Sequence, residues 1–151
     1  MSTSLYTQKL IEASRNTENR LSPGSKPDQF DFHIQGQNPV CGDRVIFFVT
    51  MDGDRIAGIS YDVAGCLMSQ ASAAFLAVFA RGKAPEQLRA LYEEISRITS
   101  PDGPGPDPAA DEQLAAAKPW LALAQIRDYP ARRKCVMMAW DALMKQLPSL
   151  Q

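Results

Sequence analysis

The sequence contains no apolar run of the roughly 18 residues that a membrane-spanning helix needs. Residues 1–10 are mostly polar and rich in hydroxyl groups, so they lack the pattern of a secretion leader. The formal net charge is −1, which removes any general attraction to nucleic acid or to anionic lipid. We therefore expect a cytoplasmic protein that has neither nucleic acid nor a membrane as its partner.

Familiar catalytic motifs are also missing. The chain has no P-loop, no Gly-x-Gly-x-x-Gly, no nucleophile-elbow serine and no His-Glu-x-x-His pattern. Its single histidine, His33, lies on the polar face of a predicted strand. Although histidine is the commonest metal ligand, we do not expect His33 to bind a metal.

Cysteine is scarce and odd in number: the chain has Cys41, Cys66 and Cys135. Three cysteines cannot form a complete set of disulfides, and no two of them form a Cys-x-x-Cys pair. In a reducing compartment, metal binding or thiol chemistry is the natural use of such residues. The alternative is that they are small buried apolar residues, as free cysteines often are.

The length and composition indicate one globular domain. The chain has 151 residues, of which 45% are hydrophobic and 22% charged, and a chain of this size can bury a core without disulfides. We assign residues 1–151 to that single domain. A proline-rich stretch around residues 99–119 predicts an insertion within it, because prolines recur too often for a helix or an inner strand.

The periodicity of the first half predicts one helix and three strands. Apolar residues at helical spacing indicate a short amphipathic helix over residues 5–13. Alternation predicts a half-buried strand over residues 30–35, and the segments 45–49 and 56–63 should form an antiparallel hairpin. The first hairpin segment is apolar on both faces. In the second, the alternating apolar residues are Ala57, Ile59, Tyr61 and Val63.

The second half is predicted to be helical. An alanine-rich helix should run from Cys66 to Gly82, and Pro85 should open an amphipathic helix reaching Ile95. Residues 111–117 favour a helix, residues 120–126 form a short apolar segment, and the last helix should begin near residues 128–130 and end at about Leu147. The charged residues expected to face water on the second helix are Glu86, Glu93, Glu94 and Arg97.

These elements predict the fold class. The order is an N-terminal helix, a small three-stranded antiparallel sheet and then a helical C-terminal half packed on it, which is an α+β arrangement. The apolar stripe of the last helix is expected in the core: Val136, Trp140, Leu143 and Leu147.

A metal site is one use that the sequence allows for the cysteines. Gly42 permits a sharp turn that brings Cys41 and Asp43 together. Cys66 lies where a strand gives way to a helix, and Cys135 lies near the start of the last helix. Zn²⁺ favours four ligands, and thiolates and a carboxylate are both acceptable. Widely separated cysteines are a weak zinc signal, so the spacing alone leaves the other uses open.

Positive charge next to Cys135 fits such a site. Helix N-termini and nearby cations favour the thiolate form, which binds metal or attacks sulfur. Arg133 or Lys134 would also balance the excess negative charge of three thiolates and a carboxylate. The alternative is an ordinary solvated basic turn.

Three motifs together resemble the IscU/NifU-like family of iron–sulfur cluster assembly proteins, and specifically its SufU branch. The resemblance extends from about Leu5 to Leu147. Lys134 stands where IscU-like scaffolds carry a histidine, and the proline-rich stretch matches an extra segment of SufU-like members. The motifs are Asn38-Pro39-Val40-Cys41-Gly42-Asp43, Gly65-Cys66-Leu67-Met68-Ser69-Gln70-Ala71-Ser72, and Arg132-Arg133-Lys134-Cys135 followed by Trp140.

The resemblance implies a zinc-dependent sulfur carrier rather than a self-sufficient enzyme. By motif position, Cys41 would accept persulfide sulfur from a SufS-type cysteine desulfurase, activate that enzyme and pass sulfur towards a SufBCD-type complex. An Hsp70 chaperone is not expected, because Asp128-Tyr129-Pro130-Ala131 replaces the proline-rich Hsp70 element of IscU-like scaffolds. The implied zinc ligands are Cys41, Asp43, Cys66 and Cys135, supported by Gly42, Gly65, Arg133 and Lys134.

Two alternatives stay open. The same ligands would hold iron or a [2Fe-2S] cluster in a scaffold, or a structural zinc would tie down a non-catalytic interaction domain. The chain also departs from the family pattern near the second motif, which bears on desulfurase docking and on the Cys66 turn. The departures are Val63, Ala64, Leu67 and Ala74.

Overall fold

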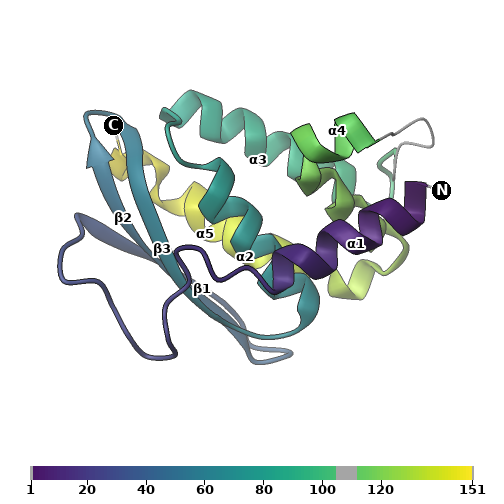
Figure 1. Ribbon diagram of the computed structural model, residues 1–151, viewed down its shortest axis with the longest axis horizontal. Helices are drawn as coiled ribbons and strands as arrows, with labels where there is room; N and C mark the ends of the chain where they lie inside the picture. The colour runs from purple at the N-terminus through teal and green to yellow at the C-terminus, as the bar shows by residue number, and fades with distance from the viewer. Residues whose placement is uncertain (1, 105–111, 151) are drawn as a thin grey trace.

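The computed structural model describes residues 2–104 and 112–150, and it has the predicted α+β arrangement (Figure 1). One helix precedes a three-stranded antiparallel sheet, and the remaining helices follow it. The elements are α1 (Ser2–Ser14), β1 (Phe32–Asn38), β2 (Asp43–Asp52), β3 (Arg55–Ala64), α2 (Leu67–Phe79), α3 (Pro85–Thr99), α4 (Glu112–Ala117), the 3-10 helices η1 (Pro119–Asp128) and η2 (Pro130–Arg132), and α5 (Arg133–Leu150).

The sheet has the strand order β1-β2-β3, and its inner face carries the centre of the core. Phe47 pairs with Ile34 on one side and with Tyr61 on the other, and all three side chains are fully buried. Helices α2 and α5 pack on this face, α2 against β3 and α5 against β1. Helix α2 begins at Leu67, just after β3 ends at Ala64, and the Asn38 side chain at the end of β1 lies 3.9 Å from Cys135 Sγ near the start of α5. The starts of both helices therefore lie at the same end of the sheet.

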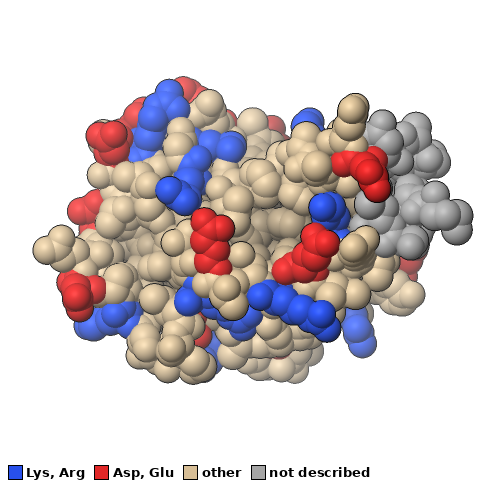
Figure 2. Space-filling view, in the orientation of Figure 1, with Lys and Arg blue, Asp and Glu red and all other residues tan. Residues whose placement is uncertain are grey.

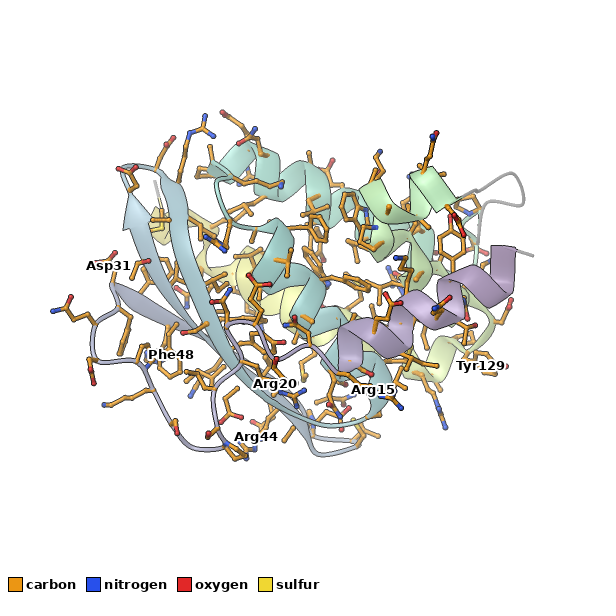
Figure 3. The ribbon with its side chains drawn as sticks, in the orientation of Figure 1. Arg15, Arg20, Asp31, Arg44, Phe48 and Tyr129 are labelled. Carbon is orange, nitrogen blue, oxygen red and sulfur yellow. The ribbon has the colours of Figure 1, made fainter. Side chains whose placement is uncertain are left out.

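The outer face of the sheet is covered around Phe48, which explains why the first hairpin segment is apolar on both faces. The connection from α1 to β1 runs along this side (Figure 1). Its Phe30 packs edge-on against Phe48 of β2, with ring centroids 4.9 Å apart. Phe48 lies on the side of this connection (Figure 3), and His33 lies 6.5 Å from the Phe48 ring. His33 thus belongs to the outer aromatic layer.

Two strand predictions need correction. Ala57 does not share the burial of the other residues in its predicted alternating row, because the pairing register shifts between Thr50 and Met51. That irregularity exposes Ala57 and buries Ile56 instead. The first strand also begins later than predicted, at Phe32, and continues to Asn38.

Helices α2 and α5 are joined by a buried polar contact as well as by apolar packing. Small alanines along α2 allow close approach, as predicted, and the predicted stripe of α5 lies in the core. Ser72 Oγ donates to the Val136 carbonyl at 2.7 Å and accepts from Trp140 Nε1 at 2.9 Å. This contact satisfies the polar groups of both side chains inside the core.

The helical half differs from prediction at two points. Glu94 was expected to face water, but it is half-buried, accepts a hydrogen bond from Trp120 Nε1 and lies 4.0 Å from Lys118 Nζ. The last helix begins at Arg133, because residues Pro130–Arg132 form a separate 3-10 turn. Of the predicted insertion, Thr99 ends α3 and residues 112–117 form α4, while residues 105–111 lie outside the described part.

The surface carries charge of both signs. Basic and acidic side chains are interspersed over the face shown in Figure 2. Among the described residues, no helix combines the length and apolar character needed to cross a membrane.

Gly36 provides a test of the packing between β1 and α5. A Cβ atom at Gly36 would lie 2.7 Å from the Met138 carbonyl oxygen, whereas one at Gly58 would meet only the Thr50 hydroxyl, at 2.8 Å. Backbone cannot rotate away as a side chain can, so Gly36→Ala should lower the free energy of unfolding by about 1–3 kcal/mol. Gly58→Ala is the matched control and should cost less. Urea unfolding measures both, and equal stability of Gly36→Ala and wild type would contradict the packing.

Candidate metal centre

The turn between β1 and β2 presents Cys41 to solvent. Asn38 ends β1, and its side-chain oxygen accepts from the Val40 N–H at 3.2 Å. Gly42 has a φ of 78° and donates its N–H to the Asn38 carbonyl at 2.8 Å. A positive φ favours glycine, so Gly42 makes the reversal possible, as predicted. The result is an exposed Cys41 two residues before the buried Asp43.

The fold brings Cys135 to this turn. The ligand atoms of Cys41, Asp43 and Cys135 all lie within 4.8 Å of one another. The Cys41 and Cys135 sulfur atoms are 3.8 Å apart. Two thiols and one carboxylate are donors that Zn²⁺ accepts. The donor set therefore fits a zinc ion, with three ligand atoms already gathered.

Asp43 is held in its ionised form by hydrogen bonds. Ser69 Oγ donates to Asp43 Oδ2 at 2.5 Å, and the Cys66 N–H lies 3.4 Å from the same oxygen. Burial alone would raise the pKa of Asp43. The hydrogen bonds, first from Ser69 and then from the Cys66 backbone, the Cys41 thiol and the Cys66 thiol, outweigh it and hold that pKa below its usual value. Asp43 is therefore a carboxylate ready to act as a ligand.

Cys135 behaves differently from the prediction. A position near a helix start and beside basic residues was expected to favour its thiolate. Burial instead raises the pKa of Cys135 to about 12, and the neighbouring Cys66, Cys41 and Asp43 add to the effect. The helix start does not compensate for the lost hydration and the crowding of groups that become anionic. In the metal-free protein Cys135 is therefore a protonated thiol.

Cys66 lies beside the three-residue cluster but is not a member of it. It is the N-cap residue of α2, its side chain is exposed, and its sulfur lies 3.6 Å from Ser69 Oγ. A Cβ atom at the preceding Gly65 would lie 2.6 Å from Asp43 Cγ, so the chain can pass Asp43 this closely only without a side chain there. Cys66 as a ligand stays a prediction.

The basic residues of the site separate into two groups. Arg133 points towards α3, where its guanidinium donates to the Ser96 carbonyl at 2.8 Å and to Thr99 Oγ1 at 3.2 Å. Lys134 and Arg132 are exposed and line the pocket around the thiols. Lys134 is thus placed to balance negative charge at the site, whereas Arg133 joins α5 to α3.

Two residues that support the site were assigned no role from the sequence. Asn38 is buried, and its Nδ2 lies 3.9 Å from Cys135 Sγ. Ser69 is buried too, and its hydroxyl lies within 3.4 Å of the Cys135 carbonyl as well as bonding Asp43. The available signals were an Asn-Pro turn pattern and a serine in the first turn of the helix that follows Cys66.

The fold and the site define a class of small α+β proteins in which a β-turn and the start of a helix bring two thiols to a carboxylate. The chain belongs to the NifU-like family: the model of the NifU-like N terminal domain matches residues 5–136. This finding confirms the family that the three motifs resemble.

Relatives of the chain carry both names of that family. It is 32% identical over 114 residues to the iron-sulfur cluster assembly scaffold protein IscU of Streptococcus pyogenes serotype M1, covering 76% of this chain and 67% of that protein. It is 29% identical over 141 residues to the zinc-dependent sulfurtransferase SufU of Bacillus subtilis (strain 168), covering 93% of this chain and 88% of that protein.

A solved structure confirms the fold. The putative iron-sulfur cluster assembly scaffold protein for the SUF system from Fervidobacterium islandicum AW-1 superimposes with a TM-score of 0.75. The match covers 97% of this chain and 99% of that one, at 21% sequence identity. At this level of identity the likeness concerns the fold alone.

The bond from Ser69 to Asp43 predicts a pH-dependent loss of stability in the metal-free protein. Because the folded-state pKa of Asp43 is lowered, its ionised form contributes stability above the unfolded pKa, about 3.9, and this is lost as pH falls through the folded pKa. Ser69→Ala should therefore cost about 1.5–3 kcal/mol near neutral pH and less in acid, as expected for a hydrogen bond to a charged group.

Urea unfolding at several pH values measures the difference between Ser69→Ala and wild type. Ser72→Ala is the matched control, because Ser72 bonds only neutral partners, the Val136 carbonyl and the Trp140 indole. Its cost should not depend on pH over the same range. A Ser69→Ala cost that is equally independent of pH would contradict the role given to this bond.

Proposed function

We propose that this protein is a zinc-dependent sulfur carrier for iron–sulfur cluster assembly, and that Cys41 accepts persulfide sulfur from a SufS-type cysteine desulfurase. The observation that carries the proposal is the unequal exposure of three gathered donors: Cys41 is exposed, whereas Asp43 and Cys135 are buried. The relative named as a zinc-dependent sulfurtransferase supports the same function.

The sulfur-accepting step needs only the Cys41 thiolate and the donor persulfide. The thiolate attacks the terminal sulfur of the donor's Cys–S–SH group, and a new sulfur–sulfur bond forms on Cys41. The donor's own sulfur–sulfur bond breaks, and its electron pair leaves with the donor thiolate. The products are a Cys41 persulfide and a donor cysteine thiolate, so no external oxidant or reductant is consumed.

The other residues keep the site in place while Cys41 reacts. A bound zinc would supply positive charge that favours the thiolate forms of its ligands. Asp43 and Cys135 are buried, and they would hold the metal together with Cys66. Gly42 and Gly65 shape the two turns, and Lys134 lines the pocket beside Cys41. The exposed Cys41 is then the ligand that is free to leave.

The partners follow from this role. A SufS-type desulfurase would supply the sulfur and be activated by its removal, and a SufBCD-type complex would receive it. Both reactions belong in the cytoplasm. The segment Asp128-Tyr129-Pro130-Ala131 lacks the proline-rich Hsp70 element, so an Hsp70 partner is not part of the proposal.

A second candidate function is a scaffold for a [2Fe-2S] cluster on the same residues. It is favoured by the relative named as an iron-sulfur cluster assembly scaffold protein. Cysteine thiolates are the usual ligands of such clusters, so the donor set does not distinguish the two functions. Iron analysis and absorbance spectra after anaerobic reconstitution would do so.

Replacement of Cys41 separates sulfur transfer from metal binding. We expect about one zinc per wild-type chain after purification without chelators. Cys41→Ala should lose persulfide acceptance and desulfurase stimulation while retaining most of its zinc, whereas Asp43→Ala should lose much of the zinc. Metal analysis and a desulfurase assay on all three proteins provide the test.

Three outcomes of this experiment count against the carrier. They are a wild-type protein without zinc, a Cys41→Ala protein that still accepts sulfur, and a Cys41→Ala protein that fails to fold. The last outcome would favour an interaction domain with a structural zinc instead.

Zinc binding should release protons, because the pKa of Cys135 is raised to about 12 in the metal-free protein. Cys135 is then protonated at neutral pH and must lose its proton to become a ligand, so the zinc affinity should fall as pH falls. Titration of the metal-free protein with zinc in weak buffer measures this release. Cys135→Ala should release about one proton fewer per zinc bound, and an unchanged release would exclude Cys135 as a ligand.

A further inference from the structure

The two edges of the sheet are not equivalent. The edge formed by β3 is closed near its middle by the chain that follows α1. The Tyr61 N–H donates to the Asn19 carbonyl at 2.9 Å, and the Leu21 N–H donates to the Tyr61 carbonyl at 2.7 Å. Within the described residues, β1 has β2 on one side and no strand on the other. An edge of this kind is a template for a further strand.

The closed edge also shows which β1 residues face outward. Tyr61 directs its N–H and carbonyl away from β2, and in an antiparallel ladder these directions alternate along each strand. Phe47, which lies opposite Tyr61, therefore makes its backbone hydrogen bonds to Ile34 of β1 and not to β3. By the same alternation, the backbone of Val45 is hydrogen-bonded to that of Gly36. The backbones of the intervening residues therefore point to the open edge. These residues are His33, Gln35 and Gln37.

A cleft of about 860 Å³ lies beside this edge. One of its walls is formed by residues 35–40. Side chains of successive strand residues point to opposite faces of a sheet. A cavity that is lined by all of these residues must therefore lie at the edge of the sheet. Helices α3 and α5 form the other wall. Asn38, Val40 and Lys134 line both this cleft and the pocket around the thiols. The cleft thus leads to Cys41.

The helical wall of the cleft is basic. It carries Arg133, Lys134 and Lys145 against a single acidic residue, Asp141, which accepts a hydrogen bond from the Tyr92 hydroxyl at 2.6 Å. Lys134 and Lys145 are exposed, and neither takes part in an ion pair within the described part of the chain. An acidic segment would complement this wall, whereas a second copy of the chain paired through the same edge would set two basic walls near each other.

We propose that the open edge of β1 and the basic wall of α5 bind an extended, acidic segment of the sulfur-donating desulfurase by strand addition. In this mode the main chain supplies hydrogen bonds, here to Gln35 and Gln37, and the side chains supply specificity. The bound segment would run beside the turn that carries Cys41. The choice of the desulfurase as partner rests on the proposed function, whereas the geometry of docking rests on the edge and the cleft.

Amide hydrogen exchange, measured by NMR with and without the SufS-type desulfurase, tests the docking directly. The Gln35 and Gln37 amides should exchange quickly in the free protein and become protected in the complex. The Ile34 and Gly36 amides, which bond to β2, should be protected in both. A complex in which Gln35 and Gln37 exchange as quickly as in the free protein would overturn the inference.

Two pairs of variants test the backbone and the charge separately. Gln37→Pro removes an outward N–H and should weaken desulfurase binding about ten-fold, while Gln37→Ala keeps that N–H and should stay within about two-fold of wild type. Lys145→Glu should weaken binding about three- to ten-fold, and more at low salt than at high salt. Its matched control is Lys26→Glu, at an exposed lysine on the connection before β1.

The outcomes distinguish this inference from the proposed function. If wild type neither binds the desulfurase nor accepts sulfur, the proposed function fails and the docking inference fails with it. If wild type accepts sulfur but Lys145→Glu and Gln37→Pro bind as wild type does, only the docking inference is overturned. If Gln37→Pro does not fold, the exchange data and Lys145→Glu still decide. A low-molecular-weight persulfide should load Cys41 equally well in wild type and Lys145→Glu.

Discussion

The site depends on one buried contact, the hydrogen bond from Ser69 to Asp43. Asp43 begins β2, Ser69 lies in the first turn of α2, and the Ser69 hydroxyl also approaches the Cys135 carbonyl of α5. A buried carboxylate without such partners would be strongly destabilising. The contact therefore allows a charge to be buried where three elements meet, and the thiols of Cys41 and Cys135 are placed around that charge.

Unequal burial gives the gathered residues different capacities. Asp43 and Cys135 have little freedom to move, because the first is held by Ser69 and the second is packed at the start of α5. Cys41 lies on a turn whose backbone is set by Asn38 and Gly42, and it faces solvent. In the proposed function, the two buried residues would hold a metal, while the exposed Cys41 thiol would meet the incoming sulfur.

The elements of the fold could be predicted because each has its own local period, as in the alternation of β1 and the alanine-rich spacing of α2. What the sequence did not reveal depends on contacts between distant segments. The irregularity at Thr50 and Met51 is a property of strand pairing. The turn at Cys41 could be predicted from Gly42 alone. The protonated state of Cys135 could not, because it results from burial in the fold. The position of Arg133 likewise depends on its hydrogen bonds to Ser96 and Thr99 of α3.

In the proposed function, Cys41 is the thiol that carries sulfur, whereas Asp43 and Cys135 anchor the metal. The most direct measurement is mass spectrometry of the wild-type protein after reaction with the desulfurase and cysteine, with the thiols alkylated and the peptides sequenced. We expect one extra sulfur atom on the peptide that contains Cys41, and none on the peptide that contains Cys135. An extra sulfur found first on Cys135, or on no cysteine, would contradict it.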